Sequence, residues 1–369
     1  MEITPRERMK MVINHERPDR TPAVLRARPE VNRALIEYFG VKDIYEVHKI
    51  LGTDGWGGVH LDISFPEFER KANTILEGDF PYAGSKVILH DKDIFEDCWG
   101  IIRKIGKDRK YVQWVSGPLV NARDPDEYNF PGPESIIEDE KLPRKVEEQK
   151  KSGLWVSGSI TQPFTLAWEL RGIENLLIDY AINHDFLEKL YDKIYLLYGE
   201  MAKKLTSAGI DQLRIVGDIA MQDRLFMRPE WWRKIDKVRL AKLISECKEI
   251  NPELHIFLHS DGNLWEIMDD LIEIGFEIID PIQPECMDPV EVKKRYGDKI
   301  VLHGCGSLQK TLPFGTPEDC REEVRYLIRN CGYNGGLVLR ISNAIGFDVP
   351  IENVVAWYEE VRNFNLSKL

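Results

Sequence analysis

The second half of the chain alternates between short apolar runs and longer segments with helical periodicity. The apolar runs are continuous, as expected of strands that are covered on both faces. They occupy residues 211–218, 254–260, 276–285, 299–304 and 336–342. The helical segments occupy residues 228–250, 263–275, 288–297, 316–332 and 350–364, with Asp288 and Thr316 placed as N-caps. Strand-helix units in series, each long enough for a crossover, predict a parallel sheet.

Two parallel architectures compete, an open doubly wound sheet and a closed (β/α)8 barrel. The glycine fingerprint of a dinucleotide-binding sheet is missing, because "GTDGWGG" at 52–58 has the wrong spacing and follows no clear strand. Polar residues instead recur at the carboxyl end of one strand after another, which is where barrel enzymes build their sites. We therefore predict an α/β chain folded as a TIM barrel.

The first half of the chain is less regular. The segment "TPAVLRARPEVNRALIEYFG" can supply a first strand and helix, "VHLDISF" a second strand, and the N-terminus a helical extension. An aromatic, β-leaning stretch and a Pro- and Asp-rich loop then predict an insertion over about 90–140, which can act as a lid or interface or extend the barrel edge. No low-complexity linker divides the chain, so we expect residues 1–369 to form a single domain.

Charge and composition narrow the class of function. The chain has 50 Lys and Arg residues against 62 Asp and Glu residues, a net charge of −12, which argues against nucleic-acid and anionic-membrane surfaces. No run approaches the ~20 apolar residues of a membrane span, and the N-terminus lacks the apolar core of a signal peptide. The 6 cysteines are scattered, which favours reduced thiols. We expect a cytoplasmic enzyme.

Candidate functional residues stand at or near the predicted strand ends. They are Arg26, Arg28, Asp62, Gln162, Asp218, Gln222, His259, Asp261, Gln283, Glu285, His303, Cys305, Arg340 and Asn343. Residues two apart on a strand point to the same side, so the pairs 259/261, 283/285 and 303/305 can each face one cavity.

Several of these residues are of metal-ligand type. A catalytic zinc needs about three protein ligands and leaves a position for substrate. His259, Glu285, His303 and Cys305, on three successive strand ends, fit that requirement. The alternative is structural, with His259 bonded to a loop carbonyl and Cys305 filling an apolar gap.

The remaining charged candidates suit acid/base chemistry or substrate binding. A carboxylate at a strand end, such as Asp62 or Asp218, can act as acid or base, or it can cap the next helix. Arg26 and Arg28 can bind substrate carboxylates by bidentate pairing, or they can lie solvated at the surface.

Long segments of the chain resemble the uroporphyrinogen decarboxylase superfamily, and within it most of all the methyltransferases that serve corrinoid proteins. The resemblance rests on "TPRERMKMVINHERPDRTPA", "GDIAMQDRLFMRPEWWRK", "FLHSDGNLWEIMDDLIEIGFEIIDPIQPECMDPVEVKKRYGDK", "LPFGTPEDCREEV" and "DVPIENVVAWYEEV". It extends over essentially the whole chain and implies a (β/α)8 barrel.

The resemblance implies one of two activities. The decarboxylases use no cofactor and bind a tetrapyrrole through N-terminal arginines and an aspartate, whose position Asp62 resembles. The methyltransferases hold zinc with a His-x-Cys pair, an acidic residue on the next strand and a cysteine on the last. Here His259 is followed by Asp261 in place of that cysteine, Glu285 matches the acidic residue, and the last strand offers Asn343.

A histidine and carboxylate set makes a harder zinc site, which suits an oxygen donor. The resemblance therefore implies a zinc-assisted methyltransferase that moves a methyl group from an O-methyl donor, such as a methoxylated aromatic, to the cobalamin cobalt of a separate corrinoid protein. In that interpretation Asp62, Asp218 and Asp261 are catalytic. Substrate contacts are expected from Arg26, Arg28, Gln162, Gln222, Gln283, Arg340 and Asn343. A metal-free decarboxylase of a tetrapyrrole or aromatic carboxylate and an inactive binding barrel remain open alternatives, and so does assembly as a homodimer.

Overall fold

The computed structural model describes residues 3–78, 80, 82–107, 109 and 111–368. Its main sheet is parallel, in the order β1-β7-β8-β9-β10-β11-β12. The strands of this sheet are β1 (Trp56–Val59), β7 (Trp155–Thr161), β8 (Gln212–Val216), β9 (His255–His259), β10 (Ile278–Asp280), β11 (Val301–His303) and β12 (Leu337–Val338). The order follows the chain, as in a barrel, and the predicted parallel sheet is confirmed.

The segment 22–27 lies between the two edges of this sheet. Val24 N donates to Leu339 O at 2.9 Å, and Leu339 N donates to Pro22 O at 2.9 Å. On the other side, Asp54 N, just before β1, donates to Ala23 O at 2.7 Å. Segment 22–27 therefore supplies the eighth position of the barrel through isolated bridges rather than a full strand, and the predicted TIM-barrel fold is confirmed.

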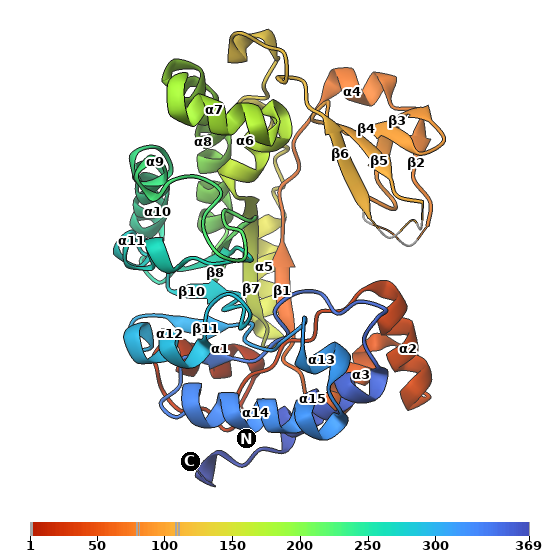
Figure 1. Ribbon diagram of the computed structural model, residues 1–369, viewed down its shortest axis with the longest axis vertical. Coiled ribbons are helices and arrows are strands. Elements are labelled where there is room, and N and C mark those ends of the chain that lie inside the picture. The colour runs from red at the N-terminus through yellow and green to blue at the C-terminus, as the bar shows by residue number, and fades with distance from the viewer. Residues whose placement is uncertain (1–2, 79, 81, 108, 110, 369) are drawn as a thin grey trace.

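Helices cover the outside of the sheet, and α1 closes its amino end (Figure 1). The helices of the first half are α1 (Pro5–Ile13), α2 (Pro29–Phe39), α3 (Ile44–Leu51), α4 (Pro66–Lys71), α5 (Leu142–Lys151), α6 (Pro163–Arg171), α7 (Ile173–Ile182) and α8 (His184–Ser207). Those of the second half are α9 (Pro229–Trp232), α10 (Val238–Ile250), α11 (Met268–Glu273), α12 (Pro289–Tyr296), α13 (Thr311–Phe314), α14 (Pro317–Cys331) and α15 (Ile351–Asn363).

The helix starts follow the capping residues found in the sequence. The Asp288 side chain accepts a hydrogen bond from Val290 N at the start of α12. Thr316 caps α14 in a reciprocal capping box with Asp319. The segment predicted as one helix from Pro229 is interrupted by a π-helical turn, Arg233–Lys237, between α9 and α10.

An antiparallel sheet, β2-β3-β4-β5-β6, is inserted after α4. Its strands are β2 (Thr74–Ile75), β3 (Lys86–Asp91), β4 (Ile94–Glu96), β5 (Ile102–Ile105) and β6 (Val112–Ser116). The sheet therefore begins earlier than the expected start of the insertion at about 90. Figure 1 shows it in orange, standing beside the barrel. It has its own small core, which includes Val87 and Phe95.

None of the helices in the described ranges is long and apolar enough to cross a membrane.

Candidate active site at the barrel mouth

Strand alternation decides which side chains face the barrel interior. On β8, Leu213 and Ile215 join the helix-facing core, so Arg214 and Val216 point inward. The register pairs Arg214 with Ser159 on one side and with Phe257 on the other. The next inward row towards the carboxyl end runs from Val216 to His259 and then to Asp280. This row forms the layer on which the mouth of the barrel is built.

Asp280 is the centre of a buried ionic network. His259 Nδ1 lies 2.5 Å from Asp280 Oδ2, and His303 Nδ1 lies 2.6 Å from Oδ1. Arg340 donates to the same carboxylate at 2.8 and 3.0 Å. Burial opposes ionisation of Asp280, yet Arg340 and the two histidines outweigh it and hold its pKa well below the usual range. A carboxylate with this many donors is an ionised anchor.

Gly304 permits this close packing. Its φ is +71°, a conformation that L side chains rarely adopt, and a Cβ would lie 2.6 Å from Asp280 Oδ1. The chain therefore turns beside Asp280 immediately after β11.

His259, Asp261 and Asp218 bring their ligand atoms within 4.8 Å of one another. Because Asp280 occupies Nδ1 of His259, the free ligand atom of the ring is Nε2. Asp261 Oδ2 accepts from Asn343 Nδ2 at 2.5 Å, while the buried Oδ1 finds no hydrogen-bond partner within the described residues. Burial and the charge of Asp218 raise the pKa of Asp261. An imidazole and two carboxylates are a ligand set that fits a divalent metal ion.

Backbone contacts hold the loops of this group together. Asp261 N donates to Asp218 Oδ1 at 2.9 Å, and Ile219 N donates to Ser260 Oγ at 3.0 Å. Gln283, predicted as a substrate contact, accepts from Gly262 N at 3.1 Å. The loops after β8, β9 and β10 are therefore fixed relative to one another.

The other predicted metal ligands do not join this group. The His303 ring packs edge-on against Trp56 and Phe257, each at 5.4 Å between centroids, and its Nε2 has no partner in the described part of the chain. Glu285 accepts a short hydrogen bond from Ser307 Oγ. Cys305 is buried in the helix-facing core, and that burial raises its thiol pKa well above the usual value. None of these three residues therefore belongs to the His259 group, although His303 shares the Asp280 carboxylate with His259.

The predicted substrate-binding residues fall into two sets. Arg340 and Asn343 contact the anchors already described, at Asp280 and Asp261 respectively. Of the others, Arg26 has an exposed side chain, and Arg28 lies over the Tyr111 ring at 5.1 Å. Gln162 caps α6, and Gln222 Nε2 donates to Gln309 Oε1 at 3.3 Å.

Asp62 lies away from the mouth. Its side chain is 72% exposed and stands 3.9 Å from His60 Nε2, and the residue lines a separate cavity with Gln149 and Ile137. The structure therefore does not bring Asp62 together with Asp218 and Asp261.

Sequence reasoning missed two inward residues, Asp280 and Arg214. Both are charged residues in otherwise apolar runs, "IID" and "LRIV". A charge inside such a run is rarely buried without a partner, so it was a usable signal.

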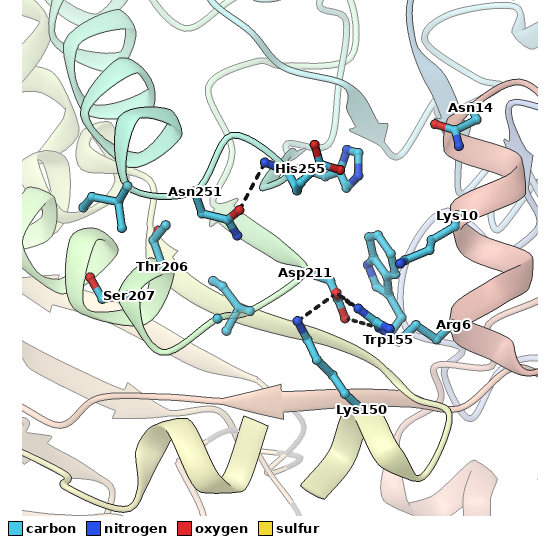
Figure 2. Close-up of a pocket in the computed structure, with 14 residues that line it drawn as sticks. Arg6, Lys10, Asn14, Lys150, Trp155, Thr206, Ser207, Asp211, Asn251 and His255 are labelled. Atoms are coloured by element: carbon cyan, nitrogen blue, oxygen red, sulfur yellow. Dashed lines mark hydrogen bonds and ion pairs between the residues drawn. The ribbon is translucent and has the colours of Figure 1, made fainter. Parts of the chain in front are cut away.

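A cavity of about 650 Å³ lies at the opposite, amino-terminal end of the barrel (Figure 2). Three of its charged side chains pair with one another, because Arg6 and Lys150 both contact Asp211, at 2.8 and 3.1 Å. Barrel enzymes place their chemistry at the carboxyl end of the strands, so we assign the candidate site to the mouth.

Three comparisons place the chain among known proteins. The family model described as "Uroporphyrinogen decarboxylase (URO-D)" matches residues 114–364. Two curated relatives are uroporphyrinogen decarboxylases. The one from Psychromonas ingrahamii is 30% identical over 80 residues, which is 22% of each chain. The one from Actinobacillus succinogenes is 25% identical over 187 residues, which is 49% of this chain and 48% of that one. The chain thus spans between about a fifth and a half of the length of these relatives.

Among solved structures, a methyltransferase from Methanosarcina mazei is similar over the full length. The alignment covers 98% of this chain and 99% of that one, with a TM-score of 0.66 and 19% sequence identity. At this identity the likeness establishes the fold. Since the family model spans well over half of the sequence, the chain belongs to the uroporphyrinogen decarboxylase family.

Proposed function

We propose that this chain is a methyltransferase that moves a methyl group from an O-methyl donor to the cobalt of a separate corrinoid protein, with zinc held at the mouth of the barrel. The observation that carries the proposal is the convergence of His259, Asp261 and Asp218 within 4.8 Å of one another. A full-length structural likeness to a methyltransferase is consistent with it.

The residues present fit a zinc ion. Three ligands of nitrogen and oxygen type leave a fourth position for substrate, which is the pattern of catalytic zinc sites. Bound there, zinc would supply Lewis acidity to the ether oxygen of the donor. The unpartnered Oδ1 of Asp261 supports this fit, because a buried carboxylate oxygen needs a cation or a donor.

The chain's own residues orient this set. Asp280 accepts the Nδ1 proton of His259 and so leaves the Nε2 lone pair directed away from the anchor. Asn343 donates to one oxygen of Asp261 and holds the other in place. Asp218 is exposed, so the third ligand stands on the solvent side, where a donor and a docking partner can approach.

A metal-free decarboxylase is the second candidate, and one observation favours it. The exposed Arg26 side chain stands near Asp280 and Asp261 at the mouth, where it can bind a substrate carboxylate. The position of Asp62 argues against this candidate. The resemblance implies that Asp62 takes the place of the decarboxylase aspartate, yet its side chain is exposed and lines a different cavity.

A direct assay separates the candidates. Purified protein is mixed with a reduced corrinoid protein and a methoxylated aromatic, and methylcobalamin is followed by visible spectroscopy. We expect methylcobalamin to form, to be abolished by a chelator and by His259→Ala, and to persist in His60→Ala, whose side chain is 82% exposed.

Two results would contradict the proposal. Decarboxylation of a tetrapyrrole or aromatic acid in the presence of chelator, without methyl transfer, would establish the metal-free reaction. If neither methyl transfer nor decarboxylation occurs with any donor tested, the result would point to a barrel that only binds its ligand.

A further inference from the structure

Arg214 is a cation inside the barrel that forms no ion pair with the residues that the structure describes. Its guanidinium carbon lies 4.7 Å from the centre of the Phe257 ring and 6.0 Å from that of Trp56. Its Nε is buried and has no hydrogen-bond partner, and no carboxylate of the described residues forms an ion pair with it. Buried arginines are normally paired, because an unpaired charge in a poorly solvated site is costly.

The charges around Arg214 do not neutralise it. Asp280 already accepts from Arg340, His259 and His303. Arg26 adds another cation on the mouth side. Burial, together with Arg26 and Arg340, outweighs the attraction of Asp280 and lowers the pKa of Arg214. Asp280 thus acts on Arg26, Arg214 and Arg340, but among the described residues only Arg340 forms an ion pair with it. Asp218 and Asp261 would be balanced by a divalent ion.

The interior around Arg214 is reached from the mouth. Ser159, its inward neighbour in the register, is exposed, and so is Arg26. The opposite end is closed by an apolar cluster that includes Met9 and Trp155. A molecule entering the mouth therefore meets Arg26 first and Arg214 further in.

The geometry points to Arg214 as a substrate-binding residue that pairs with a carboxylate of the substrate, deep to the His259, Asp261 and Asp218 group. This inference rests on the proposed function for its donor class, which is then a small carboxylic acid with a methoxy group elsewhere on the molecule. Packing against two aromatic rings fixes the orientation of the guanidinium plane. Its N–H donors can then form two parallel hydrogen bonds to a planar carboxylate.

The test is calorimetric binding to the zinc-loaded protein. The ligands are a methoxybenzoate, the matched neutral methoxybenzamide and uroporphyrin, a tetrapyrrole that also carries carboxylates. The proteins are wild type, Arg214→Gln, Arg214→Lys and the control Arg144→Gln, whose side chain is 81% exposed on α5. Zinc content and thermal unfolding of each variant show whether the metal group and the fold are intact.

We expect the methoxybenzoate to bind and the amide to bind much more weakly. Arg214→Gln should lose roughly ten- to a hundredfold in affinity for the acid, since one charge-assisted pairing is removed. Arg214→Lys should recover part of that loss, and Arg144→Gln should bind as wild type does. Zinc content should be the same in all four proteins.

The remaining outcomes separate this inference from the proposed function. Binding of uroporphyrin but not of the methoxybenzoate, dependent on Arg214, would support the carboxylate site and overturn the methoxylated donor. Equal affinity for the acid and the amide, unchanged affinity in a folded Arg214→Gln, or no binding of either carboxylate would overturn the role of Arg214.

Discussion

The two ends of the barrel each centre on a buried aspartate, but their surroundings differ. At the amino end, Asp211 accepts from Arg6, Lys150 and Val156 N, and the charged neighbours are thereby paired. At the mouth, Asp280 is equally well paired, yet unpartnered polar atoms lie around it, on Arg214, Asp261 and His303. Figure 2 shows the paired arrangement at the amino end.

The difference separates stability from binding. Paired groups such as those of Asp211 tie α1 and α5 to the sheet and need no ligand. Unpartnered buried atoms carry a cost that a ligand can remove. At the mouth they belong to the charged side chains of Arg214 and Asp261, whereas next to Asp211 the unpartnered atom is the neutral Gln212 Nε2. We therefore take the mouth as the binding end. Substitutions at the two ends should accordingly affect different properties.

The largest effect is expected at Asp280. Asp280→Ala leaves Arg340 and both histidines without their buried anion, so the free energy of unfolding should fall by about 3–5 kcal/mol. Zinc binding should also be lost, because His259 loses its orienting acceptor. Denaturant unfolding and elemental analysis measure the two effects. Asp223→Ala, at an exposed aspartate, is the control. If the free energy of unfolding of Asp280→Ala lies within about 1 kcal/mol of wild type, Asp280 is not the central anchor of the mouth.

The matching change at the amino end is Asp211→Asn. Its donors are partly exposed and screened, so we expect a loss of about 1–2 kcal/mol at neutral pH and unchanged zinc content. Burial by itself would raise the pKa of Asp211. The pKa is nevertheless lowered, because Asp211 pairs with Arg6 and Lys150 and accepts a hydrogen bond from Val156 N. The stabilisation is therefore present above the unfolded pKa of about 4 and is lost as pH falls through the lower folded value.

Unfolding curves of wild type and Asp211→Asn between neutral and acid pH test this assignment. The difference between the two proteins should shrink below about pH 4. A difference that stays constant in acid would show that the ionised carboxylate is not its source.

A smaller effect is expected at Asn343. Asn343→Ala removes the hydrogen bond to Asp261 Oδ2, so zinc affinity should fall roughly tenfold while the free energy of unfolding changes by less than about 1 kcal/mol. Competition with a chromogenic chelator measures the affinity. Asn330→Ala, on the surface of α14, is the matched control. Unchanged affinity in Asn343→Ala would mean that Asp261 needs no such support.

The fold was largely predictable because its signals are local and repeated. Continuous apolar runs, helical periodicity and the caps at Asp288 and Thr316 each depend on a few neighbouring residues. The barrel position that segment 22–27 fills was harder to predict, since this segment pairs only through isolated bridges to residues far along the chain. The insertion began earlier than predicted because β2 and the start of β3 carry little of the aromatic pattern that marked it.

The structure brings together only some of the predicted site residues, and the reason is physical. Alternation placed His303 and Cys305 on one side, but β11 ends at His303 and Gly304 takes a positive φ, so the alternation stops there. Cys305 consequently faces the helices. His259 and Asp261 also stand at a strand end, yet hydrogen bonds to Asp218 and Asn343 hold Asp261 near the histidine. Such loop contacts cannot be obtained from periodicity.

The proposed zinc site is tested by the zinc content of Asp261→Asn and Cys305→Ala, purified side by side with wild type. We expect about one zinc per chain in wild type and in Cys305→Ala, and its loss in Asp261→Asn, because Asp261 lies in the ligand group and Cys305 lies in the helix-facing core. Retention of zinc by Asp261→Asn together with its loss from Cys305→Ala would contradict a zinc site built on His259, Asp261 and Asp218.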